Sequence, residues 1–161
     1  MLNESYLIRA SLKSTRAELA EVFPHLTDDI LDWSPTPGMR TIKGQIVEIL
    51  GTEESIVARL MGKPRRPFSE VEADFVVLER TSDFIGKLAE VRAVTLCFLD
   101  SLSCEQLDLP VDLPDDYRSY LDLDVVPVSE MLRFLVRHES YHTGQLVSYL
   151  WARGNDPYTW D

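Results

Sequence analysis

Two histidines, His138 and His142, are four residues apart in a segment that otherwise repeats apolar residues at helical spacing. Residues four apart lie on one face of an α-helix, with Cβ atoms about 5–6 Å apart. Two imidazoles so placed suit one metal ion, which bonds each nitrogen at about 2.0–2.1 Å. The spacing therefore predicts that His138 and His142 bind one divalent metal ion.

The same pair could instead serve the fold alone, as neutral core histidines that hydrogen-bond to the backbone. Two observations favour the metal. Two of the chain's three histidines form the pair, and a buried polar group without a partner costs roughly 1–3 kcal/mol, which ligation would remove. The third histidine, His25, follows Pro24 in an expected loop, and we do not count it as a ligand.

A metal site of the catalytic kind uses three protein ligands and leaves one position for water or substrate. In the second expected helix, Glu53 falls inside the apolar stripe and Glu48 lies on its flank. Either carboxylate could be the third ligand, and either could be a solvated surface acid. The stripe by itself favours Glu53.

Apolar residues recur at alternating steps of four and three in four segments of the chain. This spacing places them on one face of a helix that packs in a bundle. We expect the first three helices after the capping residues Asn3, Thr41 and Ser82, and the fourth over residues 129–153, ending at Gly154. The sequence therefore predicts an all-α four-helix bundle, with the second and fourth helices adjacent because their polar positions need polar partners.

Long connections join the expected helices, over residues 23–40, 63–81 and 103–127. Connections of this length permit long crossover loops. Residues 107–113 and 120–126 could pair as a short hairpin, although Pro110 counts against it. A chain of 161 residues suits one hydrophobic core, so we expect a single domain over residues 1–161.

The charge of the chain narrows the partners that it could have. Its 27 acidic and 16 basic residues give a net charge of −11, whereas phosphate neutralisation needs clustered Lys and Arg, which occur only in the short run of residues 63–66. No segment has the roughly 20 apolar residues that span a bilayer, and the first residues lack a targeting segment. These features predict no nucleic-acid partner, no membrane association and a cytoplasmic location.

The segment HESYHTGQL, from His138 to Leu146, resembles the last-helix signature of the DinB/YfiT-like family of four-helix bundles. The segments LDWSP (31–35), GQIVEILGTE (44–53) and LAEVR (88–92) extend this resemblance over nearly the whole chain. The resemblance implies a bundle that holds nickel, zinc or a similar ion through a histidine of the second helix and two ligands of the last helix.

At the position of the second-helix histidine this chain has Glu48. The resemblance therefore implies Glu48 as the third ligand beside His138 and His142, whereas the apolar stripe favours Glu53. We rank Glu48 first and keep Glu53 as the alternative. Zinc or nickel is the expected ion, and a carboxylate ligand also admits harder ions such as manganese or iron.

The resemblance further implies a metal-dependent enzyme that acts on a small molecule and forms a homodimer. Both a hydrolase and an S-transferase that uses a low-molecular-weight thiol, such as mycothiol or bacillithiol, fit an open metal site. The alternative hypothesis is a non-catalytic stress-response or binding protein in which the metal is structural or absent, since fold alone does not define function.

Overall fold

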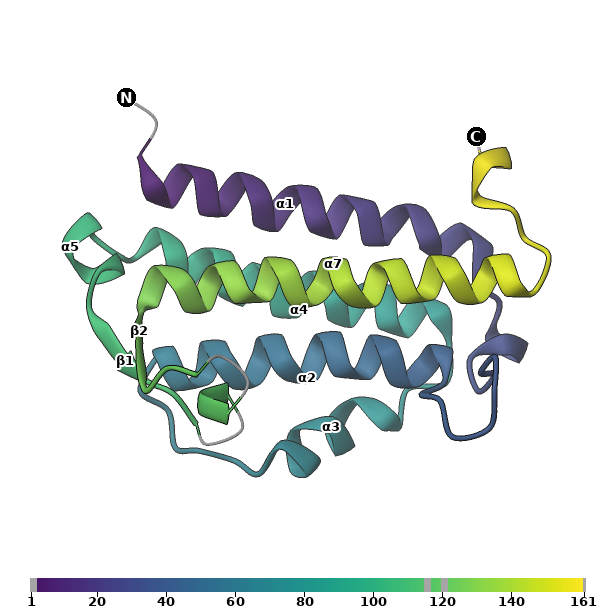
Figure 1. Cartoon of the computed structure of the whole chain (residues 1–161), viewed down its shortest axis with the longest axis horizontal. Coiled ribbons are helices and arrows are strands. Elements are labelled where there is room, and N and C mark those ends of the chain that lie inside the picture. Colours follow the sequence, from purple (N-terminus) through teal and green to yellow (C-terminus); the bar gives the residue numbers. More distant parts are fainter. Residues whose placement is uncertain (1–2, 115–116, 120–121, 161) are drawn as a thin grey trace.

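Four long helices lie side by side in the computed structural model, which describes residues 3–114, 117–119 and 122–160 (Figure 1). They are α1 (Glu4–Val22), α2 (Ile42–Leu60), α4 (Thr81–Asp100) and α7 (Val128–Ala152). α1 packs against α7 and α4, and α2 packs against the same two helices. The predicted all-α four-helix bundle is confirmed, and so is the adjacency of the second and fourth long helices.

The long helices are joined by crossovers. α1 and α7 run in one direction and α2 and α4 in the other (Figure 1). The connections from α1 to α2 and from α4 to α7 each join helices that are diagonally opposite in the bundle. α3 (Phe68–Val76) carries the chain back along α2 so that α4 can run parallel to it. This helix falls within the connection expected over residues 63–81, because its nine residues are fewer than the roughly 11–18 over which a helical period can be recognised.

Side-chain caps begin two of the helices as predicted. The Asn3 side chain accepts a hydrogen bond from the Tyr6 N–H at 2.8 Å, and the Thr41 hydroxyl accepts one from the Gly44 N–H at 3.0 Å. These bonds satisfy N–H groups that have no partner within the helix. At the end of α7, Gly154 has a φ of +87°, the left-handed conformation that glycine adopts without strain.

The start of α4 differs from the prediction. The helix begins at Thr81 rather than after Ser82 as a cap. The Asp28 carboxylate accepts hydrogen bonds from the Thr81 N–H at 2.8 Å and from its hydroxyl at 3.0 Å. The helix is therefore capped by a residue 53 positions away in the sequence, which local spacing does not reveal.

The expected hairpin is present and shorter than the two segments suggested. β1 (Pro110–Asp112) pairs antiparallel with β2 (Val125–Pro127). Pro110 lies opposite Pro127 at the end of the ladder, where a missing N–H donor is tolerated. Within the expected segment 120–126, residues 120–121 lie outside the described part of the chain.

Short helical elements complete the fold: α5 (Cys104–Leu107) and the 3₁₀ turns Phe23–His25, Asp28–Ile30 and Pro157–Thr159. Among the helices that the structure describes, none combines the length and the apolar character that crossing a bilayer requires.

Candidate metal centre

A polar layer crosses the middle of the bundle between two apolar clusters. One cluster joins the C-terminal halves of α1 and α7 to the N-terminal halves of α2 and α4, and includes Leu19, Ile46, Phe84 and Leu146. The other joins the opposite halves, and includes Leu12, Ile56, Leu99 and Leu135. The buried or half-buried side chains of the layer are Arg16, Glu48, Thr52, Glu53, Arg92, Thr95, His138, Glu139 and His142.

Glu48 of α2 and His138 and His142 of α7 converge in this layer. Each offers one donor atom, and the three atoms lie within 4.8 Å of one another. Nε2 of His138 is 3.1 Å from Nε2 of His142 and 3.8 Å from Oε1 of Glu48. Two ligands bonded to one ion at about 2.1 Å with tetrahedral angles lie roughly 3.4 Å apart. The spacing and the donor types of these three residues therefore fit a divalent metal ion.

A chain of hydrogen bonds fixes the orientation of the His142 ring. The Tyr149 hydroxyl donates to the backbone carbonyl of Arg40 at 3.0 Å, so it accepts from Nε2 of Gln45, also at 3.0 Å. The amide oxygen of Gln45 then faces Nδ1 of His142 at 2.5 Å. Because that oxygen can only accept a hydrogen bond, the proton of His142 is on Nδ1. The lone pair is then on Nε2, the atom that lies near Nε2 of His138, and this is the tautomer that metal ligation requires.

His142 is also held neutral. Burial lowers its pKa, and the neighbouring His138 lowers it further, to about 4. His138 is half-buried, and its Nε2 lies 3.5 Å from the Thr52 hydroxyl in addition to the two donors described above.

Glu48 is a half-buried carboxylate with a cationic neighbour. Its Oε2 lies 2.5 Å from Nη1 of Arg40 as an ion pair, without the alignment of a hydrogen bond. Burial alone would raise the pKa of Glu48, but its contacts with His138 and Arg40 outweigh burial and place the pKa below its usual value. Burial and the charge of Glu48 together raise the pKa of Glu72, which reaches this region from α3. Glu48 is thus ionised at neutral pH, as a ligand must be.

Glu53, the alternative third ligand, is not placed with the histidines. Its Oε1 accepts hydrogen bonds from Nε of Arg92 at 2.7 Å and from the Thr95 hydroxyl at 2.6 Å. Its Oε2 accepts from Arg16 at 2.7 Å and from Arg92 at 3.0 Å. Glu53 is buried, and both its oxygens accept hydrogen bonds from the arginines rather than facing the histidines.

The same two arginines also bind Glu139 of α7. Arg16 donates to Glu139 at 2.5 Å, and Arg92 donates to its other oxygen. This network of Arg16, Arg92, Glu53 and Glu139 was not among the expectations from the sequence. A signal existed, because each of these residues lies four positions after an apolar stripe residue, namely Arg16 after Leu12, Arg92 after Leu88 and Glu139 after Leu135, and residues four apart share a helix face.

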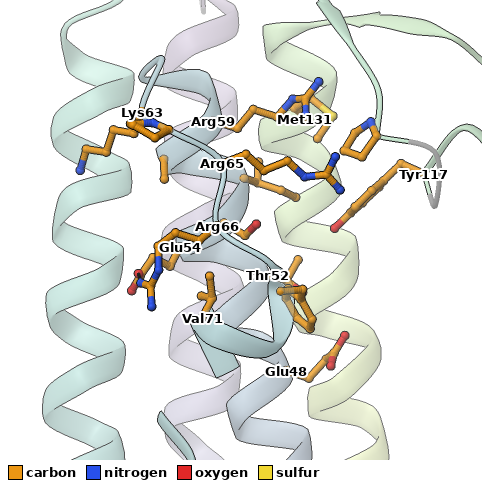
Figure 2. A pocket seen from close by; sticks show the side chains of 16 residues that line it. Glu48, Thr52, Glu54, Arg59, Lys63, Arg65, Arg66, Val71, Tyr117 and Met131 are labelled. Carbon is orange, nitrogen blue, oxygen red and sulfur yellow. Dashed lines mark ion pairs between the residues drawn. The ribbon is translucent and has the colours of Figure 1, made fainter. Parts of the chain in front are cut away.

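The side of the cluster that faces solvent borders a cavity of about 300 Å³. Glu48 and Thr52 form one end, and residues of the connection between α2 and α3 form the other (Figure 2). The third histidine lies elsewhere: the His25 ring stacks on Trp160, with 4.0 Å between ring centroids.

A four-helix bundle in which two histidines of α7 converge with a carboxylate of α2 at the edge of a cavity defines a class of helical proteins with a candidate metal centre in the bundle. The chain belongs to the DinB superfamily, whose family profile matches residues 11–146.

Comparison with solved structures supports the fold. The crystal structure of a conserved protein from Enterococcus faecalis superposes with a TM-score of 0.69 over 92% of this chain and 95% of that chain. The two sequences are 16% identical, so the likeness extends to the fold alone. No curated protein matches the sequence.

Proposed function

We propose that the protein is a metal-dependent enzyme whose divalent ion is held by His138, His142 and Glu48. The observation that carries this proposal is the convergence of three metal-binding donor atoms within 4.8 Å at the end of a cavity. Three protein donors beside a cavity match the catalytic type of site, in which one position stays open, better than the closed structural type.

The residues around the proposed ligands have separate tasks. Gln45 and Tyr149 hold the His142 ring in the tautomer that ligates, and His138 and Arg40 favour the ionised form of Glu48. A divalent ion in this position would supply Lewis-acid chemistry, by which water or a thiol becomes a good nucleophile near neutral pH. We propose zinc or nickel as the ion, since the imidazole ligands suit both. The carboxylate of Glu48 also admits harder ions such as manganese or iron.

Two reaction types fit this arrangement, namely hydrolysis and transfer of a low-molecular-weight thiol to a small-molecule substrate. Both need a nucleophile activated beside a cavity, and the cavity at Glu48 and Thr52 provides space for the second reactant. We therefore propose metal-assisted nucleophilic attack as the reaction class, with the hydrolase and the S-transferase as its two forms.

We expect about one divalent ion per chain in protein purified without a polyhistidine tag, and its loss in the variant His142→Ala. The reason is that His142 supplies one of three ligands and has its lone pair fixed toward the site. Metal content measured by mass spectrometry checks this result. His25→Ala is the matched control, because that ring stacks on Trp160 away from the site. Stoichiometric metal in both variants would show that α7 does not hold the ion.

We also expect Gln45→Leu to weaken metal binding by roughly 10–100-fold, the usual effect of removing a residue that orients a ligand. Leucine removes the acceptor that keeps the proton on Nδ1 of His142. Tyr149→Phe should weaken binding less, because Gln45 loses only its own partner. Competition titration with a metal-binding dye measures both variants. The exposed Tyr158 supplies the control, Tyr158→Phe. Equal affinities in all variants would remove the proposed role of the hydrogen-bond chain.

A further inference from the structure

The described lining of the cavity beside the candidate metal centre has more cations than acids, in a protein whose net charge is −11. Its lining has two acids, Glu48 and Glu54, and four cations, Arg59, Lys63, Arg65 and Arg66. Basic residues are a minority in this chain, so their concentration around one cavity requires a physical explanation.

Both acids of the lining are already paired. Arg40 lies beside Glu48, and Arg66 lies 3.6 Å from Glu54 and 2.8 Å from Asp74. The charge of Arg66 is therefore also matched by carboxylates. Among the described residues of the lining, the charge that remains uncompensated is positive.

The other cations have no carboxylate within ion-pair distance among the residues that the structure describes. Arg59 donates to the backbone carbonyl of Asp112, which orients its guanidinium without neutralising it. In Figure 2, Arg65 lies on the same side of the cavity as Tyr117, above Thr52 and Glu48. Lys63 projects away from the cavity in the same view. Arg59 and Arg65 are thus the cations available to a bound molecule.

The position of the two arginines relative to the metal centre suits one molecule that spans both. Glu48 and Arg59 are eleven residues apart on α2, about 16 Å along the helix axis at 1.5 Å per residue. Figure 2 shows Arg59 beside Met131, at the end of the cavity far from Glu48. The cavity lining also includes the apolar side chains of Phe68, Val71 and Met131.

We propose that this cavity binds a small-molecule substrate that carries a carboxylate or phosphate group, with Arg59 and Arg65 holding the anion and the rest of the molecule extending toward Glu48. The orientation toward the metal centre rests on the proposed function, whereas anion binding does not. Guanidinium groups bind such anions with paired hydrogen bonds, and they do so more strongly where water is partly excluded. The volume of about 300 Å³ is at the lower end for ligand pockets, so the substrate is a small molecule rather than a polymer.

The test uses three probes: 4-phenylbutyrate, phenyl phosphate and the uncharged amide 4-phenylbutanamide. Binding is measured by calorimetry with the full chain, both metal-loaded and treated with a chelator. We expect at least one anion to bind at least about tenfold more tightly than the amide, with or without metal, since charged hydrogen bonds are worth more than neutral ones. The tighter of the two anions identifies the group as carboxylate or phosphate.

Variants locate the binding. Arg65→Gln and Arg59→Gln should each weaken the anion about tenfold or more, whereas Arg59→Lys should weaken it less and the exposed Lys13→Gln should have no effect. Metal content should be unchanged in all four. Arg65→Gln is the safest of these, because Arg65 is exposed and outside the core.

The result separates this inference from the proposed function. If the chain holds no metal but anion binding still depends on Arg59 and Arg65, the anion site stands and the metal-dependent function fails. Equal affinity for the amide and both anions would overturn the inference, and so would anion binding that both glutamine variants leave unchanged. Binding that disappears with the metal would also overturn it, because the anion would then be a metal ligand.

Discussion

Replacing Glu48 with alanine should reduce metal affinity by more than about 100-fold, because residues that only orient a ligand already account for 10–100-fold. Glu48 contributes one of the three converging donor atoms and is held ionised beside Arg40. Glu48→His should restore binding of zinc or nickel, since imidazole suits these ions, and should shift preference away from manganese and iron. Titration of zinc, nickel and manganese in one buffer measures both effects.

Glu53→Gln is the matched control for this experiment. It is also a glutamate of α2, five residues further along, but its oxygens are bound to Arg92, Arg16 and Thr95. Its removal should leave metal affinity unchanged. Loss of metal in Glu53→Gln with normal binding in Glu48→Ala would mean that the carboxylate of the apolar stripe is the ligand after all. Circular dichroism of each variant separates ligand loss from unfolding.

Replacing Arg92 with methionine should lower the free energy of unfolding by about 3–5 kcal/mol, the usual result of breaking a buried ion pair from one side. For a domain of this size that corresponds to a fall in Tm of roughly 6–20 °C. Arg92 is 5% exposed and binds both Glu53 and Glu139. Without it, two buried carboxylates share the single guanidinium of Arg16.

A double variant tests whether charge balance is the cause. Combining Arg92→Met with Glu53→Met leaves Arg16 paired with Glu139. The double variant should therefore lose less free energy of unfolding than the two single variants lose in sum. Urea denaturation gives the free energies for this cycle. Lys87→Met is the exposed control, because surface pairs such as Lys87 with Glu90 contribute little. Additive losses in the double variant would show that packing, rather than charge, explains the effect of Arg92.

Acid should weaken the same network. Burial alone would raise the pKa of Glu53, but Arg92, Arg16 and Thr95 outweigh it, and the pKa lies below its ordinary value of 4.5. A carboxyl group whose pKa is lowered by folding stabilises the folded chain at pH values above its ordinary pKa. This stabilisation is lost as the pH falls through the pKa of the folded chain. Stability measured from pH 6 to pH 3 should therefore fall less steeply in Glu53→Gln than in the unaltered chain.

The long helices that carry these groups could be predicted from the sequence. The steps of four and three fixed the long helices, because apolar residues at that spacing can be buried together only on a helix face. Asn3 and Thr41 marked two helix starts and Gly154 one end, since capping depends on neighbours within four residues. The pair His138 and His142 could be recognised for the same reason, because both residues lie on one helix.

Which carboxylate lies beside the histidines depends on how the helices pack in the tertiary structure. Glu48 and Glu53 are both polar positions of one helix, and five residues turn the helix so that they face roughly 140° apart. One direction meets the histidines of α7 and the other meets Arg92 of α4 and Arg16 of α1. The amphipathic pattern of α2 indicates that one face of the helix is buried, but it does not indicate which helix packs against that face. That depends on the crossover connections, which place α7 on one side of α2 and α4 on the other.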